Sequence, residues 1–165
     1  MTSRTARPVL RLECAVVLLD ESWPTVLPGV QRLVRRAARA ALVGAGRRGD
    51  KSLTVALADD RRVRALNARH RSKDKPTNVL SYPSGERRFL GDVIVARQTV
   101  WREARAQGKQ PEAHLVHLVV HGTLHLVGYD HEIGEKEAQR METLERRVLA
   151  RLGIADPYAD EGMVG

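Results

Sequence analysis

Five of the six histidines lie between positions 114 and 131, and the spacing of three of them constrains the local fold. His121 and His125 are four residues apart, so on a helix they lie one above the other on the same face. Gly128 follows, and glycine readily adopts the left-handed conformation that ends a helix and turns the chain. The spacing therefore predicts a helix, a turn at Gly128, and the return of His131 beside the first two imidazoles.

Three converging imidazoles predict a metal site. His121, His125 and His131 would give one zinc ion three nitrogen ligands and leave a fourth position for water, which is the open arrangement of catalytic zinc. Cys14 is the only cysteine, which excludes an intrachain disulfide and a cysteine-based zinc site. The alternative is a set of hydrogen-bonded core histidines without a metal.

Three neighbours of this histidine trio have more than one interpretation. His114 lies about 10 Å along the helix from His121, which is too far to share its metal. His114 and His117 are therefore interpreted as histidines that support the ligands, line a groove or lie on the surface. Asp130 either orients a ligand histidine or caps the turn.

The same histidine spacing occurs in metzincin peptidases, whose motif is H-E-x-x-H-x-x-G-x-x-H. Gly122 stands where that motif has the glutamate that takes a proton from the zinc-bound water. Glu112 and Glu132 are close in sequence, but neither occupies the position of the motif. A metallopeptidase thus remains an alternative that lacks its usual general base.

Hydrophobic periodicity predicts one α+β domain over residues 1–154 and a flexible C-terminal tail over residues 155–165. The chain has 165 residues, 42% of them apolar, which suits a single core. Strands and helices do not alternate strictly, so we expect a roughly four-stranded mixed sheet with about five helices, one of them a metzincin-like helix that carries the histidines. The strands are expected near residues 9–19, 53–57, 78–82 and 90–96, and the helices near 27–42, 59–71, 99–107, 111–128 and 135–152.

Positive charge is concentrated in the first half of the chain. Residues 1–75 carry 17 Lys and Arg against 7 Asp and Glu, a net +10, whereas residues 76–165 carry 11 against 13, a net −2. Such a field attracts polyanions such as RNA or DNA. Arginine-rich codon usage with solvated helix faces is the alternative explanation. One helix face groups four of these arginines: Arg32, Arg35, Arg36 and Arg39.

The apolar runs are far shorter than the ~18 residues of a membrane-spanning helix. Arg11 and Glu13 also interrupt the only stretch that resembles the core of a signal peptide. We therefore expect a cytoplasmic protein that does not associate with membranes.

Three segments together strongly resemble the bacterial YbeY family. They read L-N-A-R-H-R-S-K-D-K-P-T-N-V-L-S-Y-P over residues 66–83, L-G-D-V-I-V over 90–95, and E-A-H-L-V-H-L-V-V-H-G-T-L-H-L-V-G-Y-D-H over 112–131. The resemblance covers residues 59–152 in order and spacing. The chain departs from the family at His70, where an aromatic residue usually precedes the arginine, and at Tyr82, where Phe is common.

The resemblance implies a single catalytic metallohydrolase domain that is a zinc-dependent, single-strand-specific endoribonuclease. In that family the activity serves 16S rRNA 3′-end maturation and quality control of the 70S ribosome, which implies rRNA, the ribosome or its small subunit, and assembly factors as partners. Residue by residue, the resemblance places the zinc ligands on His121, His125 and His131, and the functional arginine on Arg71.

The turn around Arg71 is a candidate RNA contact. The guanidinium of Arg71 offers a planar fork of donors that matches a phosphate, so it either holds the scissile group, positions a phosphate outside the chemistry, or forms a plain salt bridge. Arg69, Lys73 and Lys75 are expected to extend a basic path for the RNA backbone, although solvated lysines would give the same pattern. Three functions thus compete: an endoribonuclease, a metallopeptidase, and a non-catalytic, zinc-stabilised ribosome-binding module.

Overall fold

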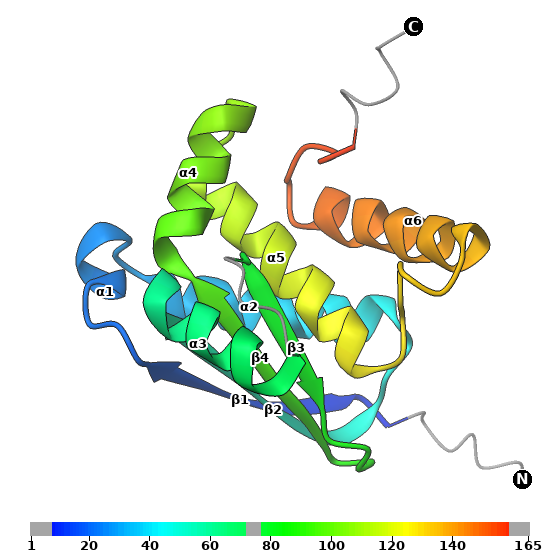
Figure 1. Cartoon of the computed structure of the whole chain (residues 1–165). Coiled ribbons are helices and arrows are strands. Elements are labelled where there is room, and N and C mark those ends of the chain that lie inside the picture. Colours follow the sequence, from blue (N-terminus) through cyan, green and yellow to red (C-terminus); the bar gives the residue numbers. More distant parts are fainter. Residues whose placement is uncertain (1–7, 72–76, 159–165) are drawn as a thin grey trace, which may run out of the picture.

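The computed structural model describes residues 8–71 and 77–158, without the side chains of His70 and Arg71. Within these residues the chain forms four strands and six helices (Figure 1). The strands are β1 (Leu10–Leu18), β2 (Gly49–Ala58), β3 (Val79–Pro83) and β4 (Phe89–Ala96). The helices are α1 (Trp23–Val26), α2 (Val30–Gly44), α3 (Asp60–Arg71), α4 (Arg97–Gln107), α5 (Pro111–Leu126) and α6 (Glu135–Arg151).

The predicted α+β class is confirmed, and each long helix and each strand coincides with a predicted segment. The sequence reading missed only the short helix α1. Pro24 suits the first turn of a helix, and the indole Nε1 of the fully buried Trp23 donates to the carbonyl of Ala58 at 2.9 Å. This tertiary hydrogen bond holds a segment too short to show a helical period.

The four strands form one mixed sheet in the order β1-β2-β4-β3. Strand β1 pairs in parallel with β2, β2 pairs in parallel with β4, and β3 pairs antiparallel with β4. The partner of Leu10 on β1 is Gly49, which extends β2 four residues beyond its predicted start at Leu53. Strand β3 is therefore an edge of the sheet.

Helices cover both faces of the sheet. Side chains alternate between the faces, so Leu53, Val55 and Leu57 of β2 join the main core with α2, α5 and α6. Ala56 and Ala58 point the other way and form a smaller cluster under α3. The architecture is three layers, with α3 on one side of the sheet and α2 and α5 on the other (Figure 1).

Helix α5 lies at the centre of the helical layer, against α2, α4, α6 and strands β3 and β4. Its apolar side chains point in almost every direction, since they are buried on several sides. The histidines of the helix are confined to one stripe, at positions 114, 117, 121 and 125. None of the helices in the described ranges is long and apolar enough to cross a membrane.

Helix α5 lies close against strands β3 and β4 at Gly122. The hydroxyl of Ser81 on β3 donates to the carbonyl of Gly122 at 3.0 Å. A Cβ atom at position 122 would lie 2.7 Å from Cγ1 of Val93 and 3.1 Å from Oγ of Ser81. The missing side chain is therefore a packing requirement of the fold.

Replacing Gly122 with Ala tests this packing. Helix propensity alone would stabilise the variant by about 1 kcal/mol. We expect the opposite sign, a loss of about 1–3 kcal/mol in the free energy of unfolding, because the stiff side chain of Val93 must move. Urea denaturation followed by circular dichroism measures the change, and an unchanged or more stable variant would contradict the packing argument.

Candidate metal centre

The side chains of His121, His125 and His131 meet at the C-terminal end of α5. One ring nitrogen from each residue lies within 4.8 Å of the others. The ring centroids are 4.7 Å apart for His121 and His125, 5.0 Å for His121 and His131, and 5.2 Å for His125 and His131. The structure thus brings together the three residues that the sequence analysis named as zinc ligands.

The turn that delivers His131 has the geometry expected from its glycine. Gly128 has a φ of 101°, and the backbone N–H of Tyr129 donates to the carbonyl of Leu124 at 3.1 Å, which ends the helix. The guanidinium of Arg47 donates to the carbonyl of Val127 at 2.9 Å and ties the turn to the loop after α2. These contacts fix the backbone that leads to the third histidine.

Asp130 caps the loop beyond this turn. Its Oδ1 accepts a hydrogen bond from the backbone N–H of Glu132 at 2.8 Å. This contact fits the capping role, one of the two roles considered for Asp130. A ring nitrogen of a ligand histidine is contacted by a different residue, Glu145.

Glu145 of α6 is fully buried, and its Oε1 lies 2.5 Å from Nδ1 of His121. Its Oε2 is 3.3 Å from Nε2 of His117 and accepts a hydrogen bond from the hydroxyl of Tyr158. Because an ionised carboxylate only accepts hydrogen bonds, Nδ1 of His121 carries the proton. The lone pair of His121 is then on Nε2, the atom that remains to bind a metal.

The sequence carried one signal for Glu145 that the sequence analysis did not use. The position lies between Met141 and Val148 on the apolar stripe of α6, at helical spacing from both. Charged residues are almost never fully buried unless they have partners. A glutamate on a core-facing stripe therefore indicates a buried partner, although it does not say which one.

The electrostatics of the centre favour a neutral His125 beside an ionised Glu145. Burial by itself raises the pKa of Glu145, but the hydrogen bonds from His117 and His121 and their electrostatic attraction outweigh it and bring the pKa to about 2. Burial, together with repulsion from His121 and His131, lowers the pKa of His125 to about 4. Neutral nitrogens are the form that binds metal, so these donors fit a divalent ion.

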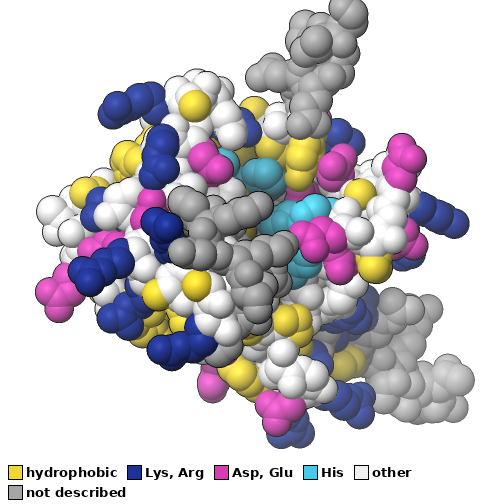
Figure 2. Space-filling view, viewed as in Figure 1, with side chains coloured by type: hydrophobic (Ala, Val, Ile, Leu, Met, Phe, Trp, Pro, Cys, Tyr) yellow, Lys and Arg dark blue, Asp and Glu magenta, His cyan; other side chains and the backbone are white. Residues whose placement is uncertain are grey.

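The histidine trio opens onto a cleft of about 510 Å³ between β3 and the loop that precedes α6. Figure 2 shows the histidine side chains gathered in one hollow of the surface, with acidic side chains beside it. The cleft is also lined by Asn78 and Ser81 from the β3 side and by His117 and Tyr158. A ligand larger than water therefore has access to the metal position.

His114 and His117 have different surroundings. His114 is buried, and its Nε2 is 2.9 Å from Oε1 of Glu103 on α4, an oxygen that also accepts from the side-chain amide of Asn78. His114 therefore helps to link α4, α5 and the start of β3. His117 lines the cleft and contacts Glu145, which makes it a supporting residue of the centre.

The predicted RNA contacts are only partly described. Arg69 is exposed on α3, and Arg71 is the last residue of the same helix, with its side chain outside the described part of the chain. Lys73 and Lys75 lie outside the described residues. On α2, the guanidinium groups of two of the four clustered arginines, Arg35 and Arg39, donate to backbone carbonyls of β1, at 3.0 and 3.2 Å, so part of that basic face is committed to the fold.

Residues 156–158, which belong to the predicted C-terminal tail, contact α6. Asp156 Oδ1 accepts a hydrogen bond from Nε of Arg146 at 3.2 Å, and the guanidinium of Arg146 lies 5.1 Å from the centre of the Tyr158 ring. These contacts join residues 156–158 to α6. Residues 159–165 lie outside the described part of the chain.

Comparison with known proteins decides the family. A sequence model described as "Endoribonuclease YbeY" matches residues 21–153. The chain belongs to the YbeY endoribonuclease family. This confirms the resemblance found in the three sequence segments.

Curated YbeY relatives match over most of their length. A protein from Azorhizobium caulinodans named endoribonuclease YbeY is 50% identical over 90% of this chain and 97% of its own length. A relative of the same name from Rhodopseudomonas palustris is 46% identical over 98% of this chain and 87% of its own. The solution structure of TM1509 from Thermotoga maritima is similar in fold, with a TM-score of 0.55 and 25% identity over 88% of this chain and 98% of that one.

Titration of the metal-free protein tests the electrostatics of the centre. We expect His125 to titrate near pH 4, well below an ordinary histidine, because of burial and its two imidazole neighbours. Since this pKa is lower in the folded than in the unfolded state, the metal-free fold loses stability as the pH falls from about 6.5 towards 4. Imidazole NMR shifts measured against pH in the presence of a chelator report the midpoint, and a midpoint at or above 6.5 would contradict the description.

Proposed function

We propose that this protein is a zinc-dependent endoribonuclease that cleaves single-stranded RNA. The observation that carries the proposal is an open centre of three histidines on a cleft, in a chain of the YbeY family. The family names of the relatives supply RNA as the substrate class. The centre supports zinc because three imidazoles are a common ligand set of catalytic zinc, whereas structural zinc normally has four protein ligands.

The residues of this centre have two different roles, metal binding and orientation of a ligand. His121, His125 and His131 would hold the ion, and Glu145 keeps His121 in the tautomer that presents Nε2. When bound, zinc supplies a Lewis acid for a phosphoryl oxygen or lowers the pKa of a water to ~7. The access of the cleft to the fourth metal position allows a phosphodiester to reach this chemistry.

We assign the phosphate contacts to the end of α3 and the residues that follow it. Arg71 would clamp the scissile phosphate through two parallel hydrogen bonds, and this assignment rests on the family motif and on the chemistry of guanidinium. Arg69, Lys73 and Lys75 would guide the RNA backbone through sequence-independent charge contacts. The net charge of +10 over residues 1–75 supports the assignment of RNA backbone contacts to this part of the chain.

The cellular role that we propose follows the family resemblance. It is maturation of the 16S rRNA 3′ end and quality control of the 70S ribosome, in the cytoplasm. The partners would be single-stranded rRNA, the ribosome or its small subunit, and assembly factors. The chain has one Phe, two Trp and three Tyr, so base stacking is limited and RNA shape and backbone carry recognition.

The packing at Gly122 argues against a metallopeptidase. A glutamate at this position, as in the metzincin motif, would bring its Cβ within 2.7 Å of Val93. Glu132 lines the cleft, and its carboxylate lies 4.0 Å from His131 Nε2, so it is the glutamate that a peptidase mechanism would have to use instead. A purely structural module is disfavoured because all three imidazoles line an open cleft and would leave a bound zinc without a fourth protein ligand.

Zinc content and cleavage measured on the same preparations test the proposed function. We expect about one zinc per chain in the wild type, cleavage of single-stranded RNA, and no cleavage of an unstructured peptide. His121→Ala should lose both zinc and RNA cleavage because only two imidazoles remain. His114→Gln keeps an N–H donor toward Glu103, lies outside the trio, and serves as the control that retains zinc.

Two results would overturn the proposal. One is equal zinc in the wild type and His121→Ala. The other is a zinc-loaded wild type that cuts the peptide and leaves the RNA intact.

Arg71→Ala and Arg71→Lys separate phosphate binding from metal binding. Both variants should keep zinc and the wild-type melting temperature, while the RNA cleavage rate falls by about 10²-fold or more because one preorganised electrostatic contact is lost. Lysine should be a poor replacement because it cannot form two parallel hydrogen bonds. Arg61→Ala, an exposed arginine in the first turn of the same helix, is the matched control. Wild-type cleavage by zinc-loaded Arg71→Ala would refute this role.

A further inference from the structure

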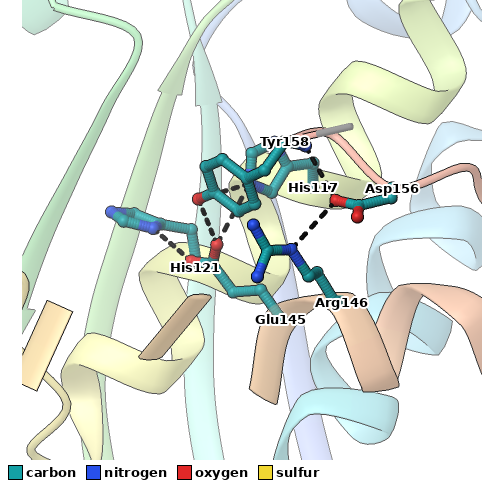
Figure 3. A network of polar contacts seen from close by, with 6 residues as sticks. All are labelled: His117, His121, Glu145, Arg146, Asp156 and Tyr158. Carbon is teal, nitrogen blue, oxygen red and sulfur yellow. Dashed lines mark hydrogen bonds and ion pairs between the residues drawn. The ribbon is translucent and has the colours of Figure 1, made fainter. Parts of the chain in front are cut away.

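The C-terminal segment reaches back to the carboxylate that orients His121. Figure 3 shows Tyr158 lying over His117, with its hydroxyl directed at Glu145, while Arg146 and Asp156 lie beside it. The rings of Tyr158 and His117 are 5.7 Å apart and nearly perpendicular, at 86°. A residue seven positions from the end of the chain thus contacts the buried part of the metal centre.

The Glu145 carboxylate depends on three donors from two parts of the chain. His121 and His117 come from α5, and the hydroxyl of Tyr158 comes from the C-terminal segment. The contact from His117 to Oε2 is long, at 3.3 Å, so the tyrosine hydroxyl is the closer partner of that oxygen. A buried carboxylate without its donors carries a large desolvation cost, and each donor also limits the rotation of the group.

Arg146 and Asp156 hold Tyr158 in this position. Asp156 Oδ1 accepts from Nε of Arg146 at 3.2 Å and from the backbone N–H of Tyr158 at 2.8 Å. The guanidinium of Arg146 lies 5.1 Å from the centre of the Tyr158 ring, within the range of a cation–π contact. Arg146 follows Glu145 directly on α6, so one turn of helix supplies both the carboxylate and the group that anchors its donor.

We propose that Tyr158 is a positioning residue of the metal centre. Through its hydroxyl it fixes the Glu145 carboxylate, and through that carboxylate it fixes the ring of His121 with Nδ1 protonated and Nε2 free. The inference rests on the proposed function in one respect, because it takes His121 as a metal ligand. Loss of a residue that contacts a metal ligand directly, as Glu145 contacts His121, typically lowers metal affinity 10-fold to 100-fold, and Tyr158 acts through that residue.

The test removes one oxygen atom. Tyr158→Phe keeps the ring against His117 and Arg146, and we expect its zinc affinity to fall about 10-fold, the lower end of that range because Tyr158 acts through Glu145, in a competition titration with a chelating dye. The matched control is Tyr129→Phe, because Tyr129 lines the same cleft and belongs to the loop after α5. A second pair tests the anchor: Arg146→Gln should weaken zinc binding, whereas Arg147→Gln, at the exposed neighbouring position, should not.

A spectroscopic readout separates positioning from general support of the fold. In the metal-free wild type, the proton on Nδ1 of His121 should give a downfield NMR signal that is protected from exchange by the Glu145 carboxylate. We expect Tyr158→Phe to broaden or shift this signal, with the backbone spectrum of β1, β2 and α2 unchanged. Arg146→Gln should have the same effect in the full-length chain.

Different results would overturn the positioning role of Tyr158 and the proposed endoribonuclease function. Wild-type zinc affinity and an unchanged His121 signal in Tyr158→Phe would overturn the positioning role, and so would an equal loss of affinity in Tyr129→Phe. A wild type that binds zinc and leaves RNA intact would instead overturn the proposed function. The NMR signal of the metal-free protein tests the link from Tyr158 to His121 in either case.

Discussion

The close contact between α5 and the edge strand β3 is the constraint on which the rest of the structure depends. At Gly122 the helix backbone approaches so closely that Ser81 bonds to its carbonyl and Val93 fills the space where a side chain would lie. This contact sets the rotation of α5 about its own axis. With apolar residues buried on most sides, the histidine stripe is left to face the cleft. The packing that stabilises the fold therefore also orients the histidine ligands toward the cleft.

A buried charge gives the centre its second support. Taking a carboxylate out of water is costly, and among the described residues the hydrogen-bond partners of the buried Glu145 are two histidines and a tyrosine rather than a Lys or Arg. Two imidazole N–H groups and one hydroxyl donate to it instead. The contacts of the two histidines outweigh burial and bring its pKa to about 2. The carboxylate can thus orient a ligand histidine without binding the metal itself. The same arrangement ties α5, α6 and the C-terminal segment together.

The basic character of the chain has two uses. Arg35 and Arg39 bind carbonyls along β1, and Arg47 binds the carbonyl at the end of α5, so these arginines stabilise the fold. Arg69 on α3 is exposed to solvent. Net charge predicted attraction to a polyanion, but it could not separate arginines that bind backbone from those that remain available to RNA. That separation depends on which carbonyls lie within reach after folding.

Much of the fold and part of the centre followed from the sequence because they depend on local spacing. The i, i+4 relation of His121 and His125 and the glycine three residues later specify a helix, a left-handed turn and a returning third ligand through backbone geometry alone. The helical and strand periods of the other segments act over the same short range. The roles of Glu145 and Tyr158 became visible only in the tertiary structure, because their partners lie 24 and 13 residues away along the chain. Likewise, the sequence showed that position 122 holds a glycine in place of the catalytic glutamate of the metzincin motif. Only the packing against Val93 and Ser81 showed that a side chain has no room there.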